Sequence, residues 1–147
     1  MIQKTYVMVK PEFANNNVVI ENIKNRLEKS GLKIEKQGFI KYDTESAKKH
    51  YHEHIGKDFY ENLENYITSD KAYGMMVTGE NAIATVRELA GTTKDPLVGT
   101  IRYDIPKMLG QERHITKNVV HSSDSEQASM LELSIFDELL KKEYKNF

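Results

Sequence analysis

The sequence contains no cysteine, which excludes disulfide bonds and thiolate metal sites. It also has no hydrophobic run long enough to cross a membrane, and its apolar N-terminal segment is too short for a signal peptide. The formal net charge is only −1, so nothing predicts a membrane or a specific nucleic acid as a partner. We therefore expect a cytoplasmic protein in which a local group of cations binds any anionic ligand.

The composition that remains is typical of one soluble globular domain. The chain has 147 residues, of which 39% are hydrophobic and 29% are charged. This length matches an ordinary domain, and the apolar share is sufficient for one core. No repeat or linker divides the sequence, so we expect a single domain over residues 1–147.

The spacing of apolar residues predicts strands that alternate with helices. The expected strands cover residues 5–9, 33–42, 72–78 and 118–120. The expected helices cover the residues between Asn17 and Gly31, then 44–52, 58–67, 81–90 and 124–144. This order matches the α/β class with a ferredoxin-like βαββαβ plan, an α+β sandwich in which helices cover one face of a four-stranded antiparallel sheet.

Several local signals refine these boundaries. Thr44 is expected to cap the helix that follows it, and Asp58 with Glu61 has the spacing of a capping box. Gly38 is expected to mark a bulge in its strand. Residues 92–117 show little periodicity, and loops of that length are usually functional or disordered. Since Arg102 lies inside this segment, we expect the segment to form part of the site.

His121 is the leading candidate for a reacting group. It is expected to lie just after a strand and just before a helix, where backbone amides favour anions. A neutral imidazole there can attack phosphorus. Lys10, Arg87 and Arg102 are dispersed cations of the type that phosphoryl transfer needs, because its transition state spreads negative charge over oxygen atoms. Taken singly, a histidine or an arginine is more often a surface residue.

Together these residues resemble the nucleoside diphosphate kinase family over about residues 3–138. The specific pieces are Met8-Val9-Lys10-Pro11, His50-Tyr51, Phe59 with Leu63, Arg87 followed by Gly91 and Thr93, Gly99-Thr100-Ile101-Arg102, and Asn118-Val119-Val120-His121-Ser122-Ser123-Asp124-Ser125. The His-centred and Gly-Thr-Ile-Arg segments together are the strongest signal.

The resemblance implies a function and a set of roles. Members pass the terminal phosphate of a nucleoside triphosphate, typically ATP, to a nucleoside diphosphate in a ping-pong reaction through a phosphohistidine, here on His121. Phe59 would stack on the base, Leu63 would line the same slot, and Ser123 and Glu132 would support the nucleophile. The residues that would contact phosphates and ribose are Lys10, Tyr51, Arg87, Thr93, Arg102 and Asn118.

The resemblance also implies a metal ion. Mg²⁺ would be held through the nucleotide phosphates, with no metal ligands from the protein. The resemblance also implies a homo-oligomer, either a hexamer or a tetramer.

The sequence departs from the family pattern at three places. Ser122 follows the nucleophile where the family usually has glycine, Tyr103 puts a bulky side chain beside Arg102, and the segment 103–117 is longer than usual. Serine is small, so we expect activity to survive the change at Ser122, whereas the other two changes bear on local geometry and on subunit contacts. His50, His52 and His54 alternate around Tyr51, and we interpret them as a solvated helix face rather than a metal site.

A different class of function is also open. A ferredoxin-like module that binds nucleotide without turnover would share this fold, because fold alone implies no activity. Such a module would be expected to have lost at least one of the residues of the reacting set. Since Lys10, Arg87, Thr93, Arg102, Asn118 and His121 are all present, the sequence favours the enzyme.

Overall fold

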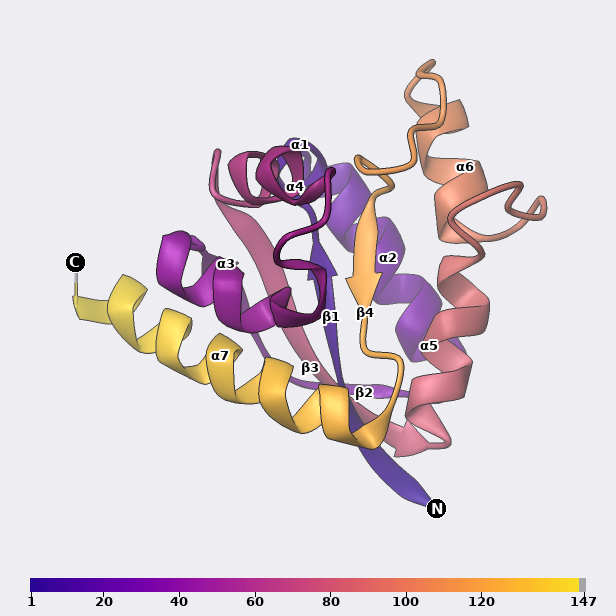
Figure 1. Ribbon diagram of the computed structural model, residues 1–147. Helices are drawn as coiled ribbons and strands as arrows, with labels where there is room; N and C mark the ends of the chain where they lie inside the picture. The colour runs from indigo at the N-terminus through magenta and orange to yellow at the C-terminus, as the bar shows by residue number, and fades with distance from the viewer. Residues whose placement is uncertain (146–147) are drawn as a thin grey trace.

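The computed structural model describes residues 1–145, with side chains described through Lys142. Figure 1 shows its elements, which follow the order β1 (Ile2–Val9), α1 (Pro11–Ala14), α2 (Asn17–Lys29), β2 (Lys33–Ile40), α3 (Thr44–His50), the 3-10 helix η1 (His52–His54), α4 (Tyr60–Ile67), β3 (Ala72–Glu80), α5 (Ala82–Ala90), α6 (Ile101–Met108), β4 (Val120–Ser122) and α7 (Glu126–Lys145). None of the helices in this described part is long and apolar enough to cross a membrane.

The strands form one antiparallel sheet in the order β2-β3-β1-β4. The central strand β1 pairs with β3 on one side and with the short β4 on the other. In the second pairing Met8 lies opposite His121. The ferredoxin-like prediction of a four-stranded antiparallel sheet with helices is therefore confirmed.

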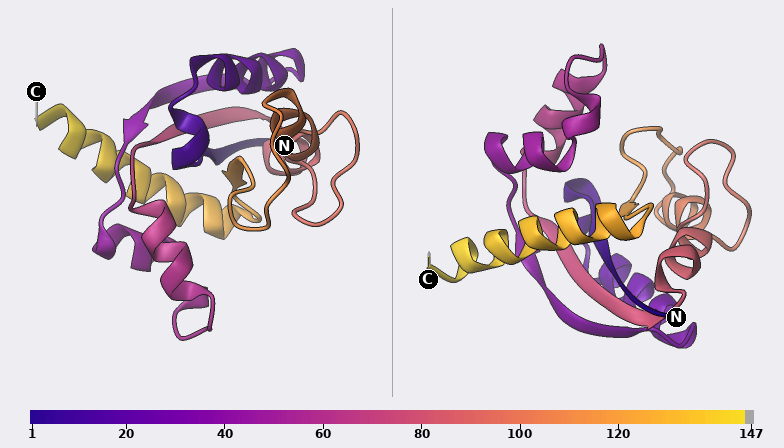
Figure 2. Two further views of the ribbon diagram at one scale, coloured as in Figure 1. Left: turned by 90° about the horizontal axis from the view of Figure 1, so that it is seen from above. Right: turned by 60° about the horizontal axis from the view of Figure 1, so that its bottom comes forward.

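Helices cover both faces of this sheet, so the prediction of one covered face was wrong. Val7 and Val9 of β1 pack in a cluster with residues of α2, α5 and α6, whereas Tyr6 and Met8 pack in a second cluster with residues of α3, α4 and α7. Figure 2 shows α2 and α7 on opposite sides of the sheet. The physical reason is visible in β1, where residues 5–9 are all buried. A strand buried on both faces is continuously apolar rather than alternating.

A pair of glycines lets α7 approach the sheet closely. Gly38 of β2 lies opposite Gly74 of β3. A Cβ at Gly74 would lie 2.4 Å from the Phe136 ring, and one at Gly38 would lie 2.9 Å from Leu140. Gly38 therefore serves close packing, and the expected bulge lies elsewhere, between Ile34 and Lys36. This contact fixes the helix that carries Glu132.

Two predicted helix caps were also wrong. Asp43, not Thr44, caps α3, because its carboxylate accepts from the backbone N–H of Ser46 in a complete capping box. The helix α4 begins at Tyr60 and has no side-chain cap, so the Asp58 and Glu61 capping box does not form. Successive backbone turns through residues 54–60 lead into α4 instead, and the N–H of Tyr60 donates to the carbonyl of Lys57.

The long segment before His121 is more ordered than its sequence predicted. It contains α6, whose buried residues are Ile101, Ile105 and Pro106. Proline inside a short helix is a strong breaker signal and hid this helix from periodicity. The segment therefore presents Arg102 from the first turn of a packed helix.

Candidate active site

His121 lies within β4 rather than beyond its end, and a strained turn precedes it. Val119 has φ 77°, and the N–H of Val120 donates to the carbonyl of Asn118 at 3.0 Å. This three-residue γ-turn with positive φ is rare and costs free energy, above all for a β-branched residue. Strain of this kind persists only where the surroundings hold it, and it is common at functional sites.

Arg102 holds this turn. Its guanidinium donates to the carbonyls of Gly91 at 2.6 Å, Val120 at 2.7 Å and Asn118 at 3.2 Å. Burial, together with the nearby charge of Arg87, lowers the pKa of Arg102 to about 10, which leaves it charged at neutral pH. The sequence suggested only a phosphate contact, whereas the structure also gives Arg102 a role in shaping the backbone before His121.

The imidazole of His121 is bound on one side only. Its Nε2 lies 2.7 Å from Glu132 Oε1, and the hydroxyl of Ser123 donates to the same oxygen at 2.7 Å. The Ser123 side chain is fully buried and its backbone N–H donates to Tyr6 of β1. The predicted neighbours Ser123 and Glu132 therefore lie against the His121 imidazole, and with Nε2 engaged the remaining ring nitrogen is Nδ1.

His50 is a site residue that sequence reasoning missed. Its Nε2 lies 3.2 Å from His121 Nε2, and its Nδ1 lies 3.1 Å from the Tyr42 hydroxyl. Burial, with the neighbouring charge of His121, lowers the pKa of His50 well below its usual value, so this imidazole is neutral. The prediction of a solvated helix face was wrong for His50, although His52 is exposed. The signal was the His50-Tyr51 pair itself, of which only the tyrosine was given a role.

Lys10, Asn118 and Thr93 form a second connected group. The Lys10 ammonium donates to Asn118 Oδ1 at 2.7 Å and to the Thr116 carbonyl at 3.0 Å, and Asn118 donates to Thr93 at 3.3 Å. Burial, with the charge of Arg102, lowers the pKa of Lys10 to about 7. An anion placed beside Lys10 would offset this burial, so the group is suited to a phosphate.

Two predicted cations meet in a cavity. Arg87, Thr93 and Arg102 line a cleft of about 740 Å³. Arg87 is exposed on α5, while Arg102 is half-buried. Ser122 lines this cleft and also the neighbouring cavity beside His50 and His121. The cleft therefore connects the arginines with the strand β4 that carries His121.

The residues expected to bind the base lie apart from these cavities. Phe59 is 50% exposed at the start of α4, and Leu63 is half-buried one turn further on. Neither lines the two cavities described above. The His54 ring lies 5.4 Å from that of Phe59, and the Lys57 ammonium lies 5.8 Å above it. Half of the Phe59 side chain thus remains exposed and accessible to a ligand.

Tyr51 connects the two regions. Its side chain is buried, its ring lies 6.4 Å from the His121 ring, and its hydroxyl has no hydrogen-bond partner among the described residues. Burial raises the pKa of Tyr51, so the phenol is neutral and can donate. A buried donor without a partner is costly, and a ligand oxygen would satisfy it.

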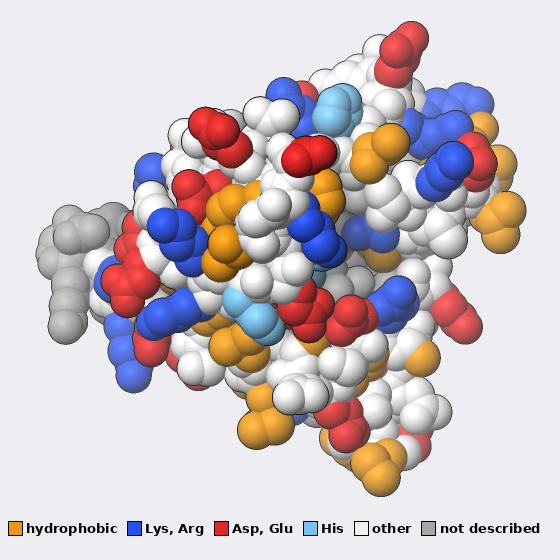
Figure 3. Space-filling model, viewed as in Figure 1, with side chains coloured by type: hydrophobic (Ala, Val, Ile, Leu, Met, Phe, Trp, Pro, Cys, Tyr) orange, Lys and Arg blue, Asp and Glu red, His pale blue; other side chains and the backbone are white. Residues whose placement is uncertain are grey.

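Tyr103, the bulky departure, points away from the cavities. Its ring lies below the Lys107 ammonium at 5.7 Å and the Arg113 guanidinium at 5.3 Å. These cations belong to α6 and to the segment that follows it, where Figure 3 shows blue side chains gathered. Tyr103 therefore packs against that segment and leaves the Arg102 guanidinium free to donate to backbone carbonyls.

A ferredoxin-like sheet that carries a partly buried histidine–carboxylate pair beside an arginine-lined cleft fits the class of nucleotide-binding phosphotransferases. The comparisons with known proteins specify the family. The family model described as "Nucleoside diphosphate kinase" matches residues 3–139. The chain belongs to the nucleoside diphosphate kinase family.

Relatives of known name and structure agree with this assignment. The chain is 42% identical over 139 residues to the nucleoside diphosphate kinase of Listeria monocytogenes, covering 92% of this chain and 88% of that one. It is 40% identical to that of Metallosphaera sedula, covering 91% and 92%. The structure of the Halobacterium salinarum enzyme in complex with CDP matches with a TM-score of 0.83 and 36% identity, covering 92% and 88%. The chain is therefore an enzyme, a kinase of nucleotides.

Proposed function

We propose that this enzyme transfers the terminal phosphate of a nucleoside triphosphate, typically ATP, to a nucleoside diphosphate through a phosphohistidine on His121. The observation that carries this proposal is the one-sided binding of the ring, with Glu132 at Nε2 and no hydrogen bond from any described residue to Nδ1. The lone pair of Nδ1 attacks the terminal phosphorus, the bond to the bridging oxygen breaks, and the nucleoside diphosphate leaves. A second diphosphate then reverses this step.

Glu132 has a definite task in this reaction. As Nδ1 bonds to phosphorus, positive charge develops on the imidazole ring, and the carboxylate at 2.7 Å stabilises it. No proton needs to leave the ring, because Nε2 keeps its hydrogen. Ser123 holds the carboxylate in place by donating to the same oxygen.

The remaining residues divide into phosphate and base contacts. We propose that Lys10, Arg87, Thr93 and Arg102 bind the phosphates, that Tyr51 donates its unpaired hydroxyl to a phosphate oxygen, and that Asn118 contacts the ribose. Phe59 would stack on the base beside Leu63. Since one aromatic face accepts every base, we expect little base preference. The relative solved with CDP supports binding of diphosphates in this family.

Mg²⁺ fits this site as a partner of the nucleotide. The arginine-lined cleft includes only two carboxylates, Glu88 and Asp124, too few for an all-protein Mg²⁺ site. We propose that the ion enters on the phosphates, in the cleft that Asp124 also lines. There it would neutralise part of the phosphate charge, a task that Arg87 and Arg102 would share.

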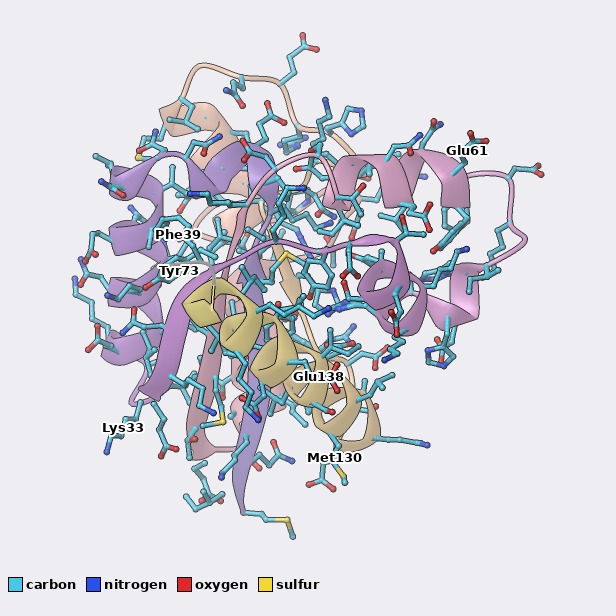
Figure 4. All side chains as sticks on the ribbon, turned by 90° about the vertical axis from the view of Figure 1, so that its left-hand side faces the viewer. Lys33, Phe39, Glu61, Tyr73, Met130 and Glu138 are labelled. Atoms are coloured by element: carbon cyan, nitrogen blue, oxygen red, sulfur yellow. The ribbon has the colours of Figure 1, made fainter. Side chains whose placement is uncertain are left out.

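Assembly and location remain proposals. The edge strand β2 carries Phe39, which is 42% exposed and packs edge-on against Tyr73 at 5.0 Å (Figure 4). An open strand edge with an apolar side chain favours pairing with another chain. We therefore propose a homo-oligomer, either a hexamer or a tetramer, and a mass measurement in solution tests it.

Three further predictions stay predictions: a cytoplasmic location, the lack of a nucleic-acid partner, and one domain over residues 1–147. Residues 146 and 147 lie outside those described.

Labelled ATP tests the proposed reaction. The protein is incubated with ATP labelled at the terminal phosphate, and we expect an acid-labile, base-stable label that added diphosphate removes. His121→Ala should carry no label, whereas His52→Ala, which changes an exposed histidine, should be labelled normally. A label retained in His121→Ala would refute the assignment of the nucleophile.

A further inference from the structure

The side chains of His50, His121 and Glu132 form a cluster that phosphoryl transfer uses only in part. One nitrogen or oxygen atom from each lies within 4.8 Å of the other two. We propose that these residues bind a zinc-class transition-metal ion through the two Nε2 atoms and the carboxylate, and that the bound ion prevents phosphorylation of His121. The binding is independent of the proposed function, whereas the inhibition rests on it.

The distances fit such an ion. The two Nε2 atoms are 3.2 Å apart, Glu132 Oε1 lies 2.7 Å from His121 Nε2, and Glu132 Oε2 lies 4.0 Å from His50 Nε2. Ligands at about 2.0–2.1 Å around a tetrahedral ion lie roughly 3.3 Å from one another. The observed separations bracket that value. Two imidazoles and one carboxylate are a known ligand set for zinc, with the fourth position left to water.

The groups behind the ligands are already in place. A metal-bound histidine almost always donates its other N–H to an oxygen, which fixes its orientation. His50 Nδ1 lies 3.1 Å from the Tyr42 hydroxyl, and that hydroxyl lies 2.8 Å from the one of Tyr6. Glu132 in turn accepts from Ser123 at 2.7 Å. His50 and Glu132, two of the three ligands, are therefore oriented by hydrogen bonds as ligands are in known metal sites.

An ion can enter from solvent. His50, His121 and Glu132 all line a cavity of about 470 Å³ between η1 and the start of α7. The His50 side chain is only 1% exposed, while that of His121 is 21% exposed. The cavity provides both a route for the ion and room for the water molecule at its open position.

Metal binding and phosphorylation make opposite demands on His121. A neutral imidazole has one N–H and one free lone pair. Attack through Nδ1 requires the hydrogen on Nε2, where it is donated to Glu132. A metal ion on Nε2 takes that lone pair and moves the hydrogen to Nδ1, which removes the nucleophile. The ion also binds the Glu132 carboxylate, whose negative charge would otherwise stabilise the phosphorylated ring.

The same chemistry separates this site from the Mg²⁺ of the reaction. Imidazole nitrogen suits zinc, cobalt and copper, while Mg²⁺ prefers oxygen ligands and retains water. An excess of Mg²⁺ should therefore leave the zinc site unchanged. This selectivity allows the two ions to be varied independently in one assay.

Equilibrium dialysis of the full chain against zinc chloride, without nucleotide, tests the binding. We expect one ion per chain, with affinity at least about tenfold weaker in His50→Gln and in Glu132→Gln. His52→Gln changes the exposed neighbour and should bind as the wild type does. Cobalt in place of zinc should give the intense visible absorption of a tetrahedral site. Equal affinity in wild type and His50→Gln, with both folded by circular dichroism, would overturn the site.

The labelling reaction then tests the inhibition. Label on the protein is measured with Mg²⁺ present, with and without zinc, and each variant is compared with its own zinc-free value. Zinc should reduce labelling of the wild type at least about tenfold more than that of His50→Gln. Equal loss in both would mean that zinc acts on ATP, and the inhibition would be rejected. Absence of label without zinc would instead reject the proposed function and leave the dialysis result intact.

Discussion

The two sides of His121 are built in opposite ways. Behind it, Glu132, Ser123 and His50 are buried and joined to one another or to the ring by direct contacts of 2.7 to 3.2 Å. The residues proposed to meet the nucleotide from the open side, among them Arg87, Thr93 and Phe59, are exposed. The difference indicates that the fold itself orients the His121 ring, while the proposed nucleotide surface stays open to solvent. A fixed reacting group beside an open binding surface suits an enzyme that carries out one reaction on nucleotides with different bases.

The largest expected effect comes from the buried side. Glu132→Gln keeps the shape of the side chain but removes the charge that stabilises the ring, so we expect kcat to fall roughly 100-fold with little change in KM. Steady-state kinetics with ATP and a diphosphate measure both constants. The matched control is Glu138→Gln, an exposed change on the same helix (Figure 4). A raised KM with unchanged kcat would place Glu132 among the binding residues instead.

The two arginines separate structure from binding. Arg102→Ala removes three hydrogen bonds to backbone carbonyls around the strained turn, so we expect the free energy of unfolding to fall by about 2–3 kcal/mol. Arg87→Ala changes an exposed side chain with no such bonds and should leave stability within about 0.5 kcal/mol, while raising KM. Denaturant unfolding and kinetics measure the two effects. Equal losses of stability would contradict this division.

Lys10 gives the next effect, through pH. Its pKa is lowered to about 7 in the folded protein, while an unfolded lysine titrates near 10.4. Between these values the unfolded chain binds more protons, so stability rises with pH. We expect a gain of about 2 kcal/mol from pH 7 to pH 9, relative to Lys10→Met. Denaturant unfolding of the wild type and of Lys10→Met at pH 7 and pH 9 measures this gain. The same change in the free energy of unfolding with pH in both proteins would show that burial does not lower the pKa of Lys10.

The sequence predicted the elements better than their ends and packing. Strands and long helices carry strong apolar periodicity, and the sheet was found from it. The helix α6 was missed because Pro106 interrupts its pattern, and Asp43 was missed as a cap because Thr44 beside it is an equally good candidate. Which faces of the sheet are covered depends on the tertiary packing. In the structure this shows as the unbroken burial of residues 5–9 in β1.

The site was predicted as a set of residues but not as a geometry. Motif similarity supplied His121, Glu132 and the cations without their contacts. The pairing of His50 with His121 brings together residues 71 positions apart, which no local pattern encodes. The second role of Arg102 depends on three carbonyls that a side-chain motif does not mention. Backbone groups and long-range contacts are the parts that required the structure.

The smallest expected effect comes from the exposed side. Phe59→Ala removes a ring that is 50% exposed and that would stack on the base, worth about 1–3 kcal/mol. We expect KM to rise about tenfold for purine and pyrimidine nucleotides alike, with kcat nearly unchanged, because the ring touches none of the groups behind His121. Ile55→Ala, an equally exposed apolar change at 51% in the preceding segment, is the control. A rise confined to one base would show that this surface selects nucleotides, and a loss of kcat would show that the two sides of His121 are coupled.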